Sequence, residues 1–215
     1  MSYQMAYNLL IATGETLYMV TISTLFAVLL GLPLGTLFYS SKNVKPMPKL
    51  QKALSVFINM SRSIPFIILL VAIIPFTRLI VGTSIGMNAA IVPLTLGAIP
   101  FFARLVDNVY QSLPGGLIET GYSMGANTRQ IILHILLPEA KPALIHAITV
   151  TAITLVNYSA MAGTVGAGGL GTLAINYGYQ RFDAGVMIST VIILIILVQL
   201  TQMLGDYLAK RFLHN

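Results

Sequence analysis

The sequence is dominated by long stretches that contain no charged side chain. Four of them carry no Asp, Glu, Lys or Arg: residues 16–41, 79–103, 142–180 and 184–205. A fifth, residues 53–77, carries only Arg62. A helix of about 20 apolar residues can cross the roughly 30 Å hydrocarbon core of a membrane, because each residue adds about 1.5 Å. These stretches therefore predict several membrane-spanning helices.

The low charge content supports the same conclusion. Charged residues form 8% of the 215-residue chain and apolar residues form 56%, whereas a soluble domain contains about 25% charged residues. A water-soluble globule and a disordered chain are both excluded. We expect an all-α membrane protein with one transmembrane domain, residues 1–215, and five spans: 16–40, 53–75, 85–103, 142–161 and 184–205.

Arg62 interrupts the second predicted span. A central Arg costs about 2.5–3.5 kcal/mol on insertion, whereas each Ile, Leu, Val or Phe contributes about 0.3–0.6 kcal/mol. Ten such residues lie between Ile64 and Phe76, and together they offset one Arg. We therefore expect the span to form, with Arg62 near the cytoplasmic boundary, either snorkelling or pointing into the bundle.

The positive charges fall mostly on one side of the predicted spans. Arg78 and Arg181 lie on one side, and nine basic residues lie on the other: Lys42, Lys45, Lys49, Lys52, Arg104, Arg129, Lys141, Lys210 and Arg211. Cytoplasmic segments carry an excess of Lys and Arg, so we expect the N-terminus outside and the C-terminus in the cytoplasm. Topology then explains the net charge of +6, and no nucleic-acid partner is expected. The first 14 residues carry no basic residue, so we expect the first span to remain in the mature protein.

No pattern of a catalytic, metal or cofactor site is present. The chain has no cysteine, its six carboxylates are scattered, and its three histidines, His134, His146 and His214, stand far apart. Residues 166–171 match G-x-G-x-x-G, but they follow a predicted membrane helix instead of a strand, so we interpret them as a flexible outer turn. No Gly-Lys pair occurs, which excludes a Walker A loop. We expect no enzyme activity in this chain.

The predicted cytoplasmic loop, residues 104–141, contains the pattern of two short helices. Residues 114–116 are Pro-Gly-Gly, and residues 117–124 form the first candidate helix. Asn127 and Gln130 have the spacing of a capping box for a second helix, residues 128–136, which we expect to stop at Pro138. One face of this second helix is apolar, and exposed apolar surface in such a place is typical of a docking site.

This loop resembles the EAA motif of bacterial ABC importer permeases, which reads E-A-A-x3-G-x9-I-x-L-P. Five positions match in register: Glu119, Gly125, Ile135, Leu137 and Pro138. Thr120 and Gly121 replace the two alanines of the motif. Four further segments resemble the methionine-uptake permeases of this group: residues 62–70, 81–86, 89–95 and 158–171. The resemblance covers essentially the whole chain.

The resemblance implies a type I importer fold in the bacterial inner (plasma) membrane. It further implies a homodimer of this chain, two cytoplasmic ATP-binding subunits that hold ATP and Mg, and an extracytoplasmic substrate-binding protein or lipoprotein. The five matched residues of the EAA motif would then couple the permease to the ATPase. No cofactor is expected on this chain, which would contact membrane lipid over its outer face. The substrate would be methionine.

The end of the fourth predicted span is the candidate substrate pathway. It contains Asn157, Tyr158, Ser159 and Met161, and polar groups at membrane depth are tolerated mainly where they face protein or a water-filled cavity. Asn157 and Met161 share one helix face, and Tyr158 is about 100° away. If this face lines the dimer axis, Met161 could contact a thioether and Asn157 could bind a zwitterion. The alternative is packing against the third or fifth span.

Three other functions remain open from the sequence. A secondary transporter or channel is disfavoured because Glu15, Asp183 and Asp206 all lie at span ends, where none can couple an ion. A purely structural membrane subunit would leave the docking loop unexplained. An ABC permease for another amino acid would share every feature described above.

The predicted topology can be tested with single cysteines, because the sequence has none. Six substituted positions would be probed on intact cells with a membrane-impermeant maleimide: Ser2, Lys45, Thr83, Asn127, Tyr179 and Asn215. We expect labelling at Ser2, Thr83 and Tyr179 only, because these lie on the predicted outer side. Labelling of the position 215 cysteine from outside would contradict the orientation.

Overall fold

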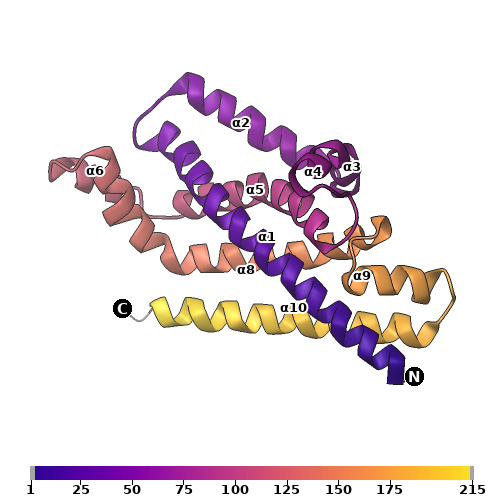
Figure 1. Cartoon of the computed structure of the whole chain (residues 1–215). Helices are drawn as coiled ribbons and strands as arrows, with labels where there is room; N and C mark the ends of the chain where they lie inside the picture. Colours follow the sequence, from indigo (N-terminus) through magenta and orange to yellow (C-terminus); the bar gives the residue numbers. More distant parts are fainter. Residues whose placement is uncertain (1–2, 214–215) are drawn as a thin grey trace.

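The uncharged stretches form long helices. A computed structural model describes residues 3–213, and this part of the chain is all-helical, with turns between the helices. Four helices dominate the elongated bundle in Figure 1: α1 (Tyr3–Asn43), α5 (Met87–Gln111), α8 (Leu137–Ala162) and α10 (Ala184–Leu213). Each contributes a segment long and apolar enough to cross a membrane. The all-α fold class is confirmed.

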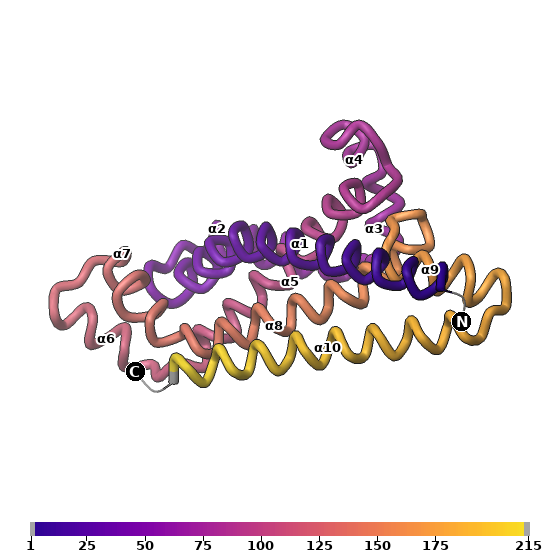
Figure 2. Tube along the Cα trace, turned by 60° about the horizontal axis from the view of Figure 1, so that its bottom comes forward, coloured from indigo at the N-terminus to yellow at the C-terminus, as the bar shows by residue number. Residues whose placement is uncertain are grey.

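The second predicted span is bent instead of straight. Residues 53–75 are divided between α2 (Pro48–Ser63) and α3 (Phe66–Ala72), whose axes differ by 99°, the geometry of a broken span or of a re-entrant loop. The break falls at Ile64, which is extended with φ −80° and ψ 122°. Pro65 causes it, because a residue before proline avoids the helical region and proline has no N–H to donate. The short α4 (Ile74–Val81) follows, and α3 and α4 project from the side of the bundle (Figure 2).

The place of Arg62 relative to the cytoplasmic boundary remains a prediction. Arg62 lies in the last turn of α2, two residues before Ile64. It stands 14 residues after Pro48, so it lies about 21 Å along the helix from that end.

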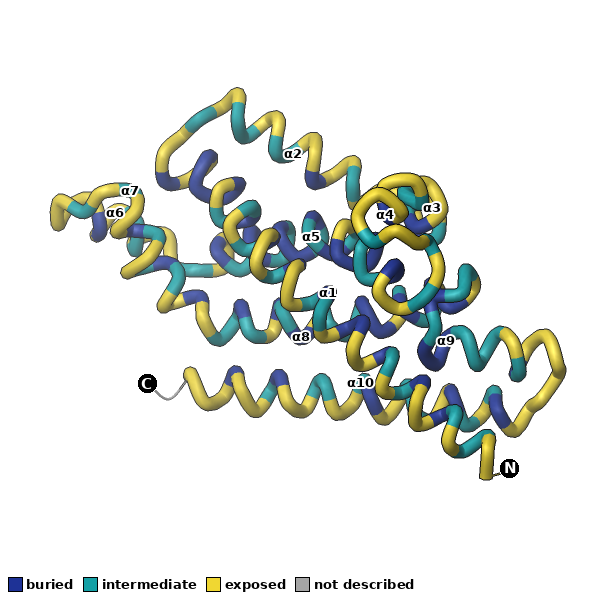
Figure 3. Tube along the Cα trace, in the orientation of Figure 1, coloured by how far each residue is buried: buried dark blue, intermediate teal, exposed yellow. Residues whose placement is uncertain are grey.

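The close contact between α1 and α5 forms the centre of the bundle. Gly31 and Gly35 of α1 face α5, and a Cβ atom at Gly35 would lie 2.5 Å from the Ala103 carbonyl oxygen and 2.7 Å from Val106 Cβ. The GxxxG pattern of α1 thus packs against the chain's own α5. Half of the apolar segment of α5 is buried, against 17% for α10, and Figure 3 shows the same contrast. The core therefore surrounds α5.

The predicted loop 104–141 is shorter than expected, because helices extend into it from both sides. Helix α5 continues to Gln111, and α6 (Gly116–Ser123) occupies the place of the first short helix. The second does not stop at Pro138: α7 (Thr128–Gln130) continues through the π-helix η1 (Ile131–Leu136) directly into α8. Pro138 lies in the first turn of α8, where a missing N–H is tolerated.

The glycine-rich turn is held in place by side chains of α1. Glu15 Oε2 accepts a hydrogen bond from the Gly169 N–H (2.6 Å), and Thr16 Oγ1 accepts one from the Leu170 N–H (2.9 Å). These amides begin α9 (Gly169–Leu173), which follows η2 (Gly163–Val165) and precedes η3 (Ala174–Tyr179). The expectation of a flexible turn is corrected, because a carboxylate and a hydroxyl from 150 residues earlier cap this helix.

The basic segments of the chain gather at one end of the bundle. The α1–α2 junction, α6 and the C-terminal end of α10 lie together at this end, and the beginning of α1 and α9 lie at the other (Figure 1). This arrangement agrees with the predicted grouping of the nine basic residues. The assignment of this end to the cytoplasm remains a prediction. Ser2, His214 and Asn215 lie outside the described residues.

We predict that Gly35→Ala destabilises the fold and that Gly14→Ala does not. The new methyl group at Gly35 would press on the α5 backbone, and such overpacking costs about 1–3 kcal/mol. At Gly14, also in α1, nothing lies within 4 Å of the new Cβ atom. The Tm of the purified complex should fall for the first variant and stay equal or rise for the second. Equal Tm values for both variants would contradict this packing.

Candidate functional site

The five matched motif residues extend from α6 through η1 into the start of α8. Glu119 lies in the first turn of α6, where a carboxylate is favoured by the helix dipole. Its side chain is exposed, and within residues 3–213 its carboxylate has no ion-pair partner within 4.0 Å. An exposed, unpaired carboxylate on a protruding helix is available to a cation of another molecule.

Gly125 ends α6 through a backbone arrangement that requires a left-handed residue. Its φ is +78°, its N–H donates to the Tyr122 carbonyl (2.9 Å), and the Ala126 N–H donates to the Gly121 carbonyl (3.0 Å). These two bonds form a Schellman motif with Gly125 at the left-handed position. The backbone conformation at the end of α6 therefore explains why this motif position is a glycine. Nothing lies within 4 Å of a Cβ atom built there, so the space beside it is open.

The predicted capping box is confirmed at the start of α7. Asn127 Oδ1 accepts a hydrogen bond from the Gln130 N–H (3.0 Å), and Gln130 Oε1 accepts one from the Asn127 N–H (2.9 Å). The Schellman motif and the capping box thus follow each other within six residues. Together their hydrogen bonds order the junction between α6 and η1.

Close packing against η1 accounts for the glycine at position 121. Gly121 is buried, and a Cβ atom there would lie 2.9 Å from Ile135 Cδ1 and 3.0 Å from Ile131 Cγ1. The methyl group of an alanine, the residue found here in the motif, would displace both isoleucine side chains. Tyr122 Oη also donates a hydrogen bond to the Val44 carbonyl (2.6 Å), which ties α6 to the α1–α2 junction.

The motif residues divide between two cavities at this end of the bundle. Gly125 and Ile135 line a shallow cavity of about 450 Å³ together with Met124, whose side chain is 81% exposed. Leu137 lines a separate, mostly apolar cavity of about 480 Å³ beside α1 and α5. Pro138 is exposed at the start of α8. The exposed apolar surface around Met124 is typical of a protein-docking site.

The four residues of the candidate pathway point in different directions. Asn157 and Met161 are both exposed, Met161 by 47%, and share a face of α8 that no other described element covers. Tyr158 faces the chain's own α3, where its ring stacks on Phe66 with centroids 4.3 Å apart. Ser159 is buried, and its hydroxyl donates to the Val156 carbonyl (2.7 Å). Tyr158 and Ser159 therefore pack within the chain, whereas Asn157 and Met161 are free to meet another molecule.

Sequence reasoning missed a polar cluster inside the bundle. Asp107 is 2% exposed and accepts hydrogen bonds from Arg104 Nη1 (3.0 Å) and Gln111 Nε2 (2.7 Å). All three residues lie on α5, so the carboxylate is neutralised within its own helix. Their spacing along the chain is typical of one helix face and could have revealed the cluster, but this segment was interpreted as loop.

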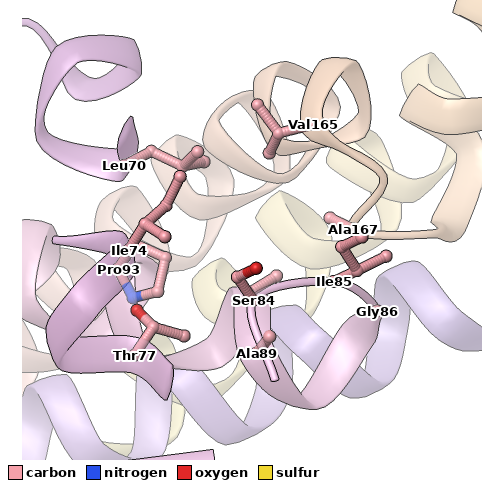
Figure 4. Close-up of a pocket in the computed structure, with 11 residues that line it drawn as sticks. Leu70, Ile74, Thr77, Ser84, Ile85, Gly86, Ala89, Pro93, Val165 and Ala167 are labelled. Carbon is pink, nitrogen blue, oxygen red and sulfur yellow. The ribbon is translucent and has the colours of Figure 1, made fainter. Parts of the chain in front are cut away.

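Near the opposite end, a small apolar cavity of about 160 Å³ separates α3 and α4 from α5 and the glycine-rich turn. Figure 4 shows its wall, in which Thr77 and Ser84 supply the side-chain oxygens and the other labelled side chains are apolar. Among residues 3–213, no group of three or more His, Cys, Asp or Glu residues could hold a metal ion. The described residues thus offer no metal centre.

The sequence matches the family of binding-protein-dependent transport system inner membrane components over residues 27–214. The chain belongs to this family. Its helices and its α6–η1 protrusion are therefore those of an inner membrane component of a transport system.

Two relatives within this family are similar over most of their length. The "Probable D-methionine transport system permease protein MetI" of Vibrio cholerae serotype O1 is 52% identical over 210 residues, which cover 96% of this chain and 93% of that protein. The D-methionine transport system permease protein MetI of Escherichia coli K12 is 52% identical over 165 residues, 76% of each chain.

Two solved structures share the fold. An inward-facing conformation of the MetNI methionine ABC transporter contains a chain that matches with a TM-score of 0.96 and 50% identity over 99% of both chains. An amino acid ABC transporter solved with histidines matches with a TM-score of 0.79 and 17% identity over 96% of this chain and 94% of that one. The match to the amino acid ABC transporter shows a shared fold and nothing more.

Proposed function

We propose that this chain is the permease subunit of an ATP-binding-cassette importer that moves methionine across the inner membrane. The observation that carries the proposal is the match to the methionine ABC transporter over 99% of both chains at 50% identity. The relatives named as D-methionine permeases support the same substrate. In this role the chain is a transporter subunit and not an enzyme.

The partners in this proposal are inferred from the missing Walker A sequence and from the exposed face of α8. It has no Walker A sequence, so ATP and Mg²⁺ are held by two cytoplasmic ATP-binding subunits. Two copies of the permease form a homodimer, and an extracytoplasmic binding protein or lipoprotein delivers the substrate. The exposed face of α8 with Asn157 and Met161 is available for the dimer axis.

Helix α8 provides the mechanical link between the two functional regions. The ATPase contacts α6 and η1 through Glu119, Gly125, Ile135, Leu137 and Pro138. Because η1 runs into α8 without a break, a displacement of η1 moves the far end of α8 as well. Twenty residues separate Leu137 from Asn157, a distance of about 30 Å along a helix. ATP-driven movement at one end of the bundle thereby reaches the substrate pathway.

The function is tested by reconstitution of the chain with its ATP-binding subunits and binding protein in proteoliposomes. We expect the ATP-binding subunits to co-purify with the chain and methionine uptake to require ATP, because the chain itself cannot hydrolyse it. Uptake driven by an ion gradient without ATP would indicate a secondary transporter. ATP-dependent uptake of another amino acid but not of methionine would contradict the substrate.

We predict that Gly125→Asp abolishes uptake and weakens association with the ATP-binding subunits, while the chain remains in the membrane. Gly125→Asn is the matched control, because Asn and Asp have similar size and both tolerate positive φ. The difference between the two variants reports the added charge at the subunit contact. Glu119→Ala should reduce uptake less, since an exposed ion pair contributes about 0–1 kcal/mol. Full uptake by Gly125→Asp would show that Gly125 is not part of the contact with the ATP-binding subunits.

We predict that Met161→Ala and Asn157→Ala change substrate preference and leave ATP hydrolysis intact. Both side chains are exposed on α8 and make no core contact whose loss would unfold the chain. Uptake of several amino acids should be compared for each variant, with ATPase activity measured in parallel. Ser159→Ala serves as a control within the packed face. Unchanged transport by both variants would show that this face of α8 does not line the substrate pathway.

A further inference from the structure

Arg62 has an unusual position for a charged residue. It lies on an exposed polar stripe of α2 with Ser55 and Asn59, which are hydrogen-bonded to each other (3.3 Å). The stripe ends at the Pro65 break between α2 and α3. An ionisable residue of a membrane-spanning segment faces water, a partner charge or a ligand, because hydrocarbon does not solvate it.

A cavity of about 250 Å³ lies beside Arg62. Its walls come from α2 and α3 on one side and from Gly97 of α5 and Tyr158 of α8 on the other. Tyr158 is four residues from the end of α8, and Gly97 is ten residues from the start of α5. The cavity therefore lies between the α2–α3 bend and the pair α5 and α8.

The charge of Arg62 is not neutralised within residues 3–213. No carboxylate lies within ion-pair distance of its side chain. Four of the six acids have other hydrogen-bond partners, and three of these are Asp107 on α5, Glu15 at α9, and Asp183 at the start of α10. Asp206 accepts from Gln202, and Glu119 and Glu139 lie at the α6 end of the bundle. A lone guanidinium beside a cavity attracts an anion that enters from outside the chain.

We propose that Arg62 binds the α-carboxylate of the amino-acid substrate during its passage through the permease, which rests on the proposed function. A guanidinium presents planar paired donors that match a carboxylate. Tyr158 forms the neighbouring wall, and its stacking on Phe66 (4.3 Å) fixes the position of α3 and hence of the bend.

The first experiment compares Arg62→Gln and Arg62→Lys in the reconstituted complex with its ATP-binding subunits and binding protein. Uptake of radiolabelled methionine and ATP hydrolysis are measured per assembled complex. Arg62→Gln should lower uptake about tenfold or more while hydrolysis is retained, because a charge-assisted hydrogen bond to the substrate is lost. Arg62→Lys should restore part of the uptake. Arg78→Gln is the matched control, since Arg78 binds Ser84 on an exposed loop outside this cavity.

A second experiment restores the charge chemically and uses the absence of cysteine in this chain. Arg62→Cys would be treated with a methanethiosulfonate that attaches an ethylammonium group, or with methyl methanethiosulfonate, which attaches a neutral methylthio group. We expect uptake to recover with the first reagent and not with the second. The wild-type complex treated with both reagents controls for cysteines of the partner subunits.

These results separate the inference from the proposed function. If the wild-type complex takes up methionine and Arg62→Gln takes it up equally well, the inference is wrong and the function stands. If Arg62→Gln lowers assembly but not uptake per complex, Arg62 holds the fold or a lipid phosphate, and the inference is also wrong. Equal rescue by the neutral and the charged reagent would overturn it as well.

Discussion

The interior of a membrane offers no water to a backbone N–H or carbonyl group, and most of this structure follows from that constraint. Helices satisfy these groups internally, which explains why the uncharged stretches are mostly taken up by the long helices α1, α5, α8 and α10. Where the chain does break, other groups replace the lost partners. The Gly86 N–H donates to the Gly166 carbonyl (2.9 Å), and α1 side chains cap α9. Two irregular turns are thus joined to the bundle by hydrogen bonds.

The sequence predicts the features that depend on neighbouring residues. The uncharged stretches predict the long helices, and Asn127 and Gln130 predict the capping box, because these signals act over a few residues. The capping by Glu15 and Thr16 joins residues 154 apart, and no local pattern reports it. The 99° bend between α2 and α3 depends on Pro65, and hydrophobicity alone does not specify its angle. The direct passage of η1 into α8 was missed for a similar reason, because proline is a helix breaker in the interior and a helix starter in the first turn.

The proposed coupling surface combines a rigid backbone with an exposed face. Gly125 supplies the left-handed turn, and the adjacent capping box begins the next helix, so the angle between α6 and η1 does not depend on a partner. The buried contact of Gly121 with Ile131 and Ile135 presses the two elements together. Met124 remains exposed as a result. A preformed surface of this kind loses little conformational entropy on binding, which is an advantage for a contact that must transmit force.

The bend at Pro65 connects this mechanical path with the proposed carboxylate site. Phe66, the first residue of α3, stacks on Tyr158 of α8, so a movement of α8 is transmitted to the segment that follows Arg62. Arg62 itself lies on the other side of the bend, at the end of α2. A movement that begins at η1 would therefore change the distance between Arg62 and the Asn157 face. Interfaces between packed rings and helices tend to switch between discrete arrangements instead of deforming continuously. A site shared by two elements on opposite sides of such a joint can hold a carboxylate in one arrangement and release it in the other.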